Sequence, residues 1–273
     1  MNRLFTIVTA FAAAVATLFL LLPVVAIFSR VPPGRLLSAL GTGRAVDALV
    51  VSVETNLVAL GLILVFGTPT AWLIATRAGR LRDLAVTLVE LPLVLPPAVA
   101  GIGLLAAFGR LGLVGGRWHW LAGELAFTKA AVVLAVAFVA SPFYVRSAIS
   151  AFEGLDPTLL RAARTLGAGQ ARTFFRIALP LAAGGLGSGA ALAFARGIGE
   201  FGATIMFAGS LRGVTQTLPV AIYEAFELDF NLALAISADL VAISAAILLA
   251  AKMLIRWRSP STSPFLFAPS SSR

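Results

Sequence analysis

The sequence has no cysteine, one histidine and two lysines in 273 residues, and charged residues make up only 12% of it. Without cysteine it has no disulfide, no thiolate metal site and no cysteine nucleophile. A metal site built on several histidines is excluded as well. Neither Lys129 nor Lys252 follows the spaced glycines or precedes the Ser/Thr of a phosphate-binding loop. Because these catalytic and metal-binding groups are missing, we expect no cofactor, no metal and no enzymatic activity in this chain alone.

Long hydrophobic runs dominate the sequence. Hydrophobic residues make up 59% of the chain, against roughly 45–50% in soluble domains. A spanning helix needs about 20 apolar residues, and helices satisfy backbone polar groups within lipid. We therefore predict an all-α membrane protein with about six transmembrane helices, at residues 4–29, 55–76, 84–109, 127–146, 181–207 and 231–251. The first run exceeds the typical 7–15 residues of a signal-peptide core, so we expect it to be retained.

The net charge of +9 does not form one patch of the kind that binds nucleic acid. With the N-terminus inside, inner segments hold 13 of the 21 basic residues, outer segments hold seven, and Arg196 lies within a span. The positive-inside rule then places both termini in the cytoplasm. His119, between Trp118 and Trp120, is most simply an interfacial residue of an outer loop.

The longest inner loop, residues 147–180, reads as two short amphipathic helices. Asp156-Pro157 suits a helix start, and Gly167 and Gly169 permit a sharp turn after it. A second helix over 171–177 should end at Leu179-Pro180, because the residue before a proline disfavours helix. Apolar residues recur on one face of the first helix: Leu159, Leu160, Ala163 and Leu166. Physical chemistry alone leaves two readings open, a helix resting on lipid headgroups and a helix docking on a soluble partner.

This loop resembles the cytoplasmic loop of the permease subunits of binding-protein-dependent ABC importers. The pattern in that family is Glu-Ala-Ala, three residues, Gly, nine residues, Ile-x-Leu-Pro. The matching positions here are Arg161, Ala162, Ala163, Gly167, Ile177, Leu179 and Pro180. Arg161 departs from the pattern, which has Glu there. The resemblance implies the type I ABC importer permease fold, with a short coupling helix that docks in a groove on a separate ATPase subunit.

Three further segments narrow the resemblance to the molybdate permease branch, which is related to the sulfate permeases. They are LPLVLPPAVAG at 91–101, ARGIGEFGATIMFAG at 195–209 and TQTLPVAIYEAF at 215–226. This branch implies a homodimer in the bacterial inner membrane that works with two ATPase copies and an external molybdate-binding protein. The cargo would be molybdate, with tungstate tolerated. The alternatives are a sulfate or thiosulfate permease, and an ion-coupled secondary transporter whose carboxylates Glu90, Glu200 and Asp239 carry protons.

Charged residues inside a span are costly and usually face a cavity or a partner. Arg196 and Glu200 are four residues apart, so they share a helix face and can pair. Bracing of the helix against a neighbour is the simpler role for this pair, and lining a gate is the functional one. Glycines and prolines that interrupt two spans complete the candidate pathway: Pro96, Pro97, Arg196, Gly199, Glu200, Gly202 and Thr204.

The expected organisation has three parts. Residues 1–47 form an N-terminal transmembrane helix and an outer loop. Residues 48–256 form the ABC type-1 transmembrane domain, with the coupling loop at 150–180. Residues 257–273, rich in Ser and Pro, form a disordered cytoplasmic tail.

Overall fold

The computed structural model describes residues 3–32, 34, 43–114 and 125–258, and every regular element in these ranges is a helix. The predicted all-α fold is therefore confirmed. The predictions for His119 and for the tail beyond residue 258 lie outside the described residues.

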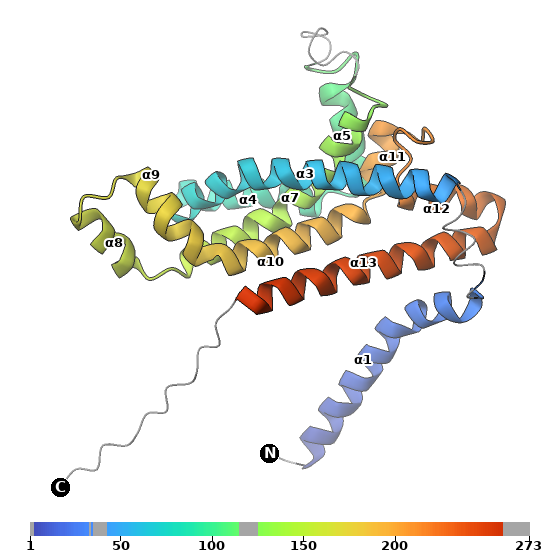
Figure 1. Cartoon of the computed structure of the whole chain (residues 1–273), viewed down its shortest axis with the longest axis horizontal. Coiled ribbons are helices and arrows are strands. Elements are labelled where there is room, and N and C mark those ends of the chain that lie inside the picture. Colours follow the sequence, from blue (N-terminus) through green and yellow to red (C-terminus); the bar gives the residue numbers. More distant parts are fainter. Residues whose placement is uncertain (1–2, 33, 35–42, 115–124, 259–273) are drawn as a thin grey trace.

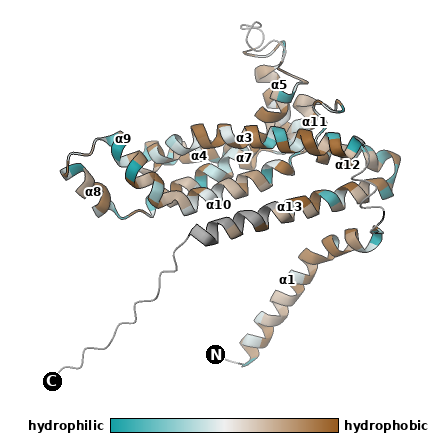
Figure 2. Cartoon of the chain, viewed as in Figure 1, coloured by the Kyte–Doolittle hydropathy of each residue, from teal (hydrophilic) through white to brown (hydrophobic). Residues whose placement is uncertain are grey.

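The long helices are α1 (Arg3–Arg30), α3 (Gly43–Ala75), α7 (Lys129–Glu153), α10 (Leu179–Ile198) and α13 (Phe230–Arg258). The short ones are α4 (Arg80–Val94), α5 (Pro97–Phe108), α8 (Pro157–Thr165), α9 (Gln170–Thr173), the π-helical turn η1 (Phe174–Ala178), α11 (Gly202–Ala208) and α12 (Leu218–Leu228). Helices α3, α7, α10 and α13 run along the molecule with α4 beside them, α1 lies at an angle to them, and α8, α9 and α12 lie toward the two ends (Figure 1). Hydrophobic residues dominate α1 and α3, whereas hydrophilic ones gather near α9 (Figure 2).

Several of these helices are suited to cross a membrane. Helices α1, α3 and α7 and the continuous helix Gln170–Ile198 are each long and apolar enough. Helices α4 and α5 together make one further candidate, bent by 110°. In α13 the apolar stretch, Phe230–Ala246, is shorter. A multi-span helical protein is thus confirmed, and the number six stays a prediction.

Helices α3 and α10 pack on α7 through glycines. A Cβ added at Gly67 of α3 would lie 3.0 Å from Cδ1 of Tyr144 on α7. A Cβ added at Gly185 of α10 would lie 2.5 Å from Cβ of Ala151. Small residues let membrane helices approach closely, so the glycine-rich composition of α10 is explained in part by close packing.

Ion pairs with α7 hold the carboxylates of Glu54 and Glu90. Glu54 Oε2 of α3 lies 2.7 Å from Nζ of Lys129 at the start of α7. Glu90 Oε1 of α4 lies 3.1 Å from Nε of Arg146 of α7. Asp239 lies buried on α13, and its Oδ2 has no hydrogen-bond partner among the described residues.

One predicted helix boundary is wrong. The chain does not leave the helix at Leu179-Pro180 but continues from α9 through η1 into α10. The backbone N–H of Leu179 donates to the carbonyl of Phe174, five residues back. This wider π turn precedes the proline, so the missing N–H of Pro180 falls in the first turn of α10 and the helix is not broken.

Candidate functional site

Residues 150–180, which the sequence predicts to be a coupling loop and which keep that name below, fold as predicted at the start of the first helix and at the turn after it. The Asp156 carboxylate accepts hydrogen bonds from the backbone N–H of Thr158, at 2.8 Å, and from the Thr158 hydroxyl. Pro157 occupies the first turn of α8. Gly167 has φ of +81°, in the left-handed region that favours glycine. These two features fix the ends of α8.

The apolar face of α8 is only partly covered by the chain. Ala163 is buried and Leu160 is half-buried, but Leu166 is 87% exposed and Leu159 is 49% exposed. Arg161 and Ala162 are exposed on the same short helix. Further along the loop Ile177 is half-buried in η1, and Leu179 and Pro180 begin α10. The residues that match the family pattern therefore lie on one continuous segment, and this segment exposes both apolar and basic side chains.

An aromatic cluster holds the root of this loop against the long helices. The rings of Trp72 on α3 and Phe152 on α7 meet edge-on with centroids 5.2 Å apart. Phe174 of η1 lies 5.5 Å from Trp72 and 6.1 Å from Phe152 by centroid. Aromatic pairs of this kind each contribute about 0.5–1.5 kcal/mol beyond their buried area. The cluster therefore ties η1 to both α3 and α7.

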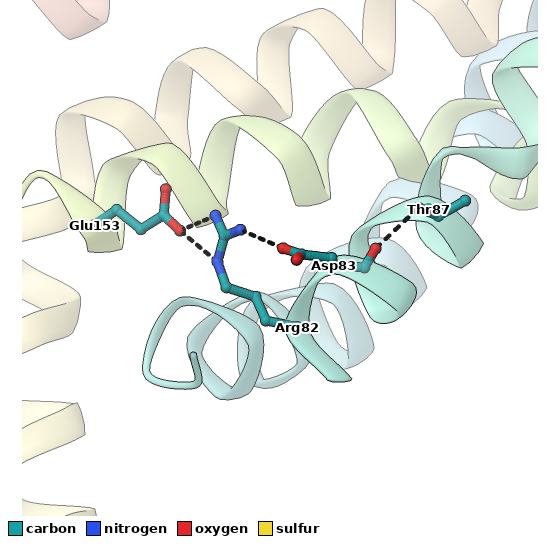
Figure 3. Close-up of polar contacts among 4 residues, drawn as sticks. All are labelled: Arg82, Asp83, Thr87 and Glu153. Atoms are coloured by element: carbon teal, nitrogen blue, oxygen red, sulfur yellow. Dashed lines mark hydrogen bonds and ion pairs between the residues drawn. The ribbon is translucent and has the colours of Figure 1, made fainter. Parts of the chain in front are cut away.

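An ion pair fixes the neighbouring end of α4 (Figure 3). The Arg82 guanidinium donates to Oε1 of Glu153, the last residue of α7, through Nη2 at 2.5 Å and Nε at 3.2 Å. Its Nη1 donates to Asp83 Oδ1 at 3.3 Å. The α7 end that leads into α8 is thus held by α4 as well.

The cap at Asp156 predicts a pH effect. Hydrogen bonds from the Thr158 hydroxyl and backbone N–H lower the pKa of Asp156 because they favour the carboxylate. Since the folded pKa lies below the unfolded one, the cap stabilises α8 above about pH 4. That stability is lost as the pH falls through the folded pKa. We expect hydrogen exchange over residues 157–165, corrected for intrinsic rates, to lose protection below about pH 4.

Asp156→Asn is the control for this prediction. Its neutral amide oxygen still accepts the Thr158 hydrogen bonds, so protection of α8 should change little over the same pH range. An equal loss of protection in both proteins would contradict the assignment of the effect to the cap.

Two helix breaks meet in the middle of the molecule. Helix α4 ends at Val94 and the chain turns through Pro96 into α5. Helix α10 ends at Ile198, and α11 starts at Gly202. A Cβ at Gly202 would lie 2.6 Å from Cβ of Pro97. The structure therefore brings the predicted interruptions of the two spans into contact, although they are about a hundred residues apart in the sequence.

The predicted Arg196–Glu200 pair is present at this junction. Arg196 Nη2 lies 2.7 Å from Glu200 Oε2. Glu200 is 2% exposed, and its other oxygen accepts from the backbone N–H of Ala203 at 2.8 Å. Glu200 thus joins the end of α10 to the start of α11. Thr204 is fully buried, whereas Gly199 is exposed beside an apolar cavity of about 380 Å³ against α12 and α13.

Sequence reasoning missed Asn56, the residue through which α3 is hydrogen-bonded to α10 near this junction. The Asn56 amide donates from Nδ2 to the carbonyl of Phe194 at 2.9 Å, and Asn56 is 2% exposed. A Cβ at Gly197 would lie 2.1 Å from Asn56 Oδ1 and 2.8 Å from Cγ1 of Val136. The only sequence clue was a polar side chain within an apolar run.

Gly197→Ala should destabilise the protein because neither neighbour has room for a methyl group. Overpacking costs typically 1–3 kcal/mol, which corresponds to a fall of about 5 °C in the unfolding midpoint of a chain of this size. Thermal unfolding of the purified protein measures the shift. Gly199→Ala is the matched control, since a Cβ there meets nothing within 4 Å. Equal midpoints for the two variants would show that the close approach to Asn56 is not tight.

A bundle of helices suited to cross a membrane, with two interrupted spans in contact and an exposed basic loop at one end, is the architecture expected of a membrane transport component. The comparisons with known proteins give the family. The model of the family described as "Binding-protein-dependent transport system inner membrane component" matches residues 63–263. The chain belongs to this family of multi-pass inner-membrane permease components, which are not enzymes in themselves. The predicted family is confirmed.

Named relatives are similar over most of their length. The Molybdenum transport system permease protein ModB of Mycobacterium tuberculosis is 44% identical over 87% of this chain and 90% of its own. The protein of the same name from Escherichia coli is 43% identical over 65% of this chain and 78% of its own. The Probable transport system permease protein NifC of Clostridium pasteurianum is 35% identical over 89% of this chain and 85% of its own.

Solved structures share the fold. A chain of the MetNI methionine ABC transporter in an inward-facing conformation matches with a TM-score of 0.64 at 20% identity, over 80% of this chain and 97% of its own. A chain of a bacterial ABC transporter that imports the acidic polysaccharide alginate matches with a TM-score of 0.66 at 16% identity, over 95% and 100%. The predicted type I importer permease fold is confirmed.

Proposed function

We propose that this chain is the permease subunit of an ABC importer that moves molybdate, and tolerates tungstate, across the inner membrane. The observation that carries the proposal is the 44% identity to a molybdenum transport permease over 87% of the chain. The transmembrane domain would span residues 48–256, after an N-terminal segment of residues 1–47 and before a tail of residues 257–273. Both termini would face the cytoplasm, as the distribution of basic residues favours.

The energy would come from a separate ATPase, because the sequence has no phosphate-binding loop. Two copies would dock on the coupling loops of a homodimer. Each loop exposes Leu159, Leu166 and Phe175 together with Arg161, so it offers both apolar side chains and positive charge. Such a surface fits an apolar groove with an acidic rim. The root of the loop is held by α3, α4 and α7, so displacement of the loop would move these helices together.

The pathway would open where the helix breaks meet. The candidates Pro96, Pro97, Gly199 and Gly202 allow the chain to bend there, and Arg196 supplies a positive charge for a passing dianion. Thr204 and Thr55 are both buried, so contact of their hydroxyls with cargo would need a second, open conformation. An external molybdate-binding protein would supply selectivity, and the permease would supply gates that open alternately.

Reconstitution tests this function directly. The permease would be placed in liposomes with its ATPase and molybdate-binding protein, and uptake of labelled molybdate would be followed with excess sulfate. We expect ATP-dependent uptake that sulfate does not suppress and that tungstate competes for. Suppression by sulfate would identify a sulfate permease instead. Uptake by the permease alone, driven by a pH gradient, would overturn the ABC mechanism altogether.

A further inference from the structure

A cavity of about 370 Å³ lies at the root of the coupling loop. Its lining comes in part from the end of α3 and from α9, which lie at the same end of the molecule (Figure 1). This volume is within the range of ligand sites in proteins. One wall comes from the last turn of α3 and the residues just after it, and the other from α8 and α9. The lining residues are Trp72, Leu73, Thr76, Arg77, Arg164, Gln170 and Thr173.

The two arginines of this cavity differ from Arg82 nearby. Arg82 is paired with Glu153 and Asp83. Among the described residues, the ion pairs within 4.0 Å include neither Arg77 nor Arg164. Both arginines are exposed, and they face one polar space from two different elements. A pair of unneutralised guanidinium groups is well suited to bind a phosphate group.

The wall formed by α3 indicates what carries that phosphate. Leu73 is 53% exposed, and Trp72 is half-buried, packed on Phe152 and Phe174. Tryptophan at the end of a membrane span commonly lies at the level of the lipid headgroups. The lining of the cavity is therefore apolar at Trp72 and Leu73 and cationic at Arg77 and Arg164. A free oxyanion would contact only the cationic side, whereas a phospholipid contacts both.

We propose that this cavity binds an anionic phospholipid, with its phosphate between Arg77 and Arg164 and an acyl chain against Leu73. A net-negative lipid is required because a zwitterionic headgroup would bring a second positive charge to the arginines. Basic pockets on the cytoplasmic side of membrane proteins bind such headgroups. The bound lipid bridges the end of α3 to α8, so it stabilises the resting position of the coupling loop. The inference is independent of which anion is transported.

Fluorescence quenching of Trp72 tests the site in the full-length chain. Trp118, Trp120 and Trp257 are replaced by Phe, and the protein is reconstituted in vesicles with brominated phosphatidylglycerol or brominated phosphatidylcholine. Each of the two arginines favours an anionic lipid over a zwitterionic one, so we expect a preference for phosphatidylglycerol of about thirtyfold, which corresponds to about 2 kcal/mol. Arg77→Gln with Arg164→Gln should reduce the preference to about onefold. Arg3→Gln with Arg80→Gln removes the same charge outside the cavity and should keep the preference.

Each other outcome overturns the assignment. The proposal fails if the unsubstituted cavity shows no preference between the two lipids, a measurement that needs no arginine variant to fold. It fails if both double variants lose the preference equally, since that would indicate general surface charge. Relief of quenching by millimolar phosphate or molybdate, beyond that by chloride at equal ionic strength, would assign the cavity to a free oxyanion. Loss of the preference when the ATPase is bound would assign it to the partner protein.

Discussion

Replacing Gly167 by threonine should weaken the binding of the partner ATPase roughly thirtyfold, because the turn between α8 and α9 can then no longer form without strain. A residue other than glycine in the left-handed region costs about 1–2 kcal/mol, and β-branched residues are the least tolerated there. A loss of about 2 kcal/mol corresponds to that change in affinity. The measurement is ATPase binding to permease reconstituted in nanodiscs, together with ATP-dependent uptake.

Gly169→Thr provides the matched control two residues away. A Cβ at either glycine meets nothing within 4 Å, so no clash separates the two variants. Gly169 has φ of −66° and precedes α9 as its N-cap, a position that threonine accepts about as well as glycine does. We expect Gly169→Thr to bind the ATPase normally. If both variants bind equally well, the turn at Gly167 does not present the docking surface.

Glu200→Ala should abolish transport and lower the stability of the permease. The change removes the acceptor of the buried Ala203 N–H and the partner of Arg196 together. An unsatisfied buried donor costs about 1–3 kcal/mol. Arg196 is partly exposed, so solvent screens its charge. Losing its partner therefore costs less stability than it would in a fully buried pair. Uptake in liposomes and the thermal unfolding midpoint measure the two effects separately.

Glu200→Gln separates the hydrogen bond that Glu200 accepts from the charge that it carries. The amide oxygen still accepts from Ala203, so α11 keeps its start, while the charge that holds Arg196 is lost. We expect Glu200→Gln to recover most of the stability that Glu200→Ala loses. A double-mutant cycle of Glu200→Gln with Arg196→Met should give a coupling of about 0.5–3 kcal/mol. Additive effects of the two changes would show that the pair does not act as a unit.

Local chemistry made part of this site predictable. Asp156 was recognised as a cap because its type and its neighbour Pro157 suit a helix start. Gly167 was recognised because few other residues take a left-handed turn. The Arg196–Glu200 pair followed from helical spacing, and the interruptions at Pro96 and near Gly199 followed from missing donors and small side chains. Each of these features depends on residues within one turn of each other.

The remainder depends on contacts between distant segments. The spacing of residues along one helix does not reveal that Trp72 and Phe152 pack on Phe174. Nor does it reveal that Asn56 donates a hydrogen bond to the carbonyl of Phe194. The pairing of Glu54 with Lys129 requires two helices to lie in register. The error at Leu179-Pro180 has another cause, because the rule for residues before proline assumes α-helical hydrogen bonding, and the π turn of η1 avoids that assumption.

The helix from Gln170 to Ile198 is unbroken, so it would act as a lever arm if it pivoted where Phe174 packs on Trp72 and Phe152. The arm beyond the fulcrum is about 36 Å long at 1.5 Å per residue. A tilt of about 5° would sweep its far tip through about 3 Å, close to the diameter of a water molecule. A small rotation at the loop would thereby be amplified at the Arg196–Glu200 pair, at the cost of the Asn56–Phe194 hydrogen bond that ties this end of the helix to α3.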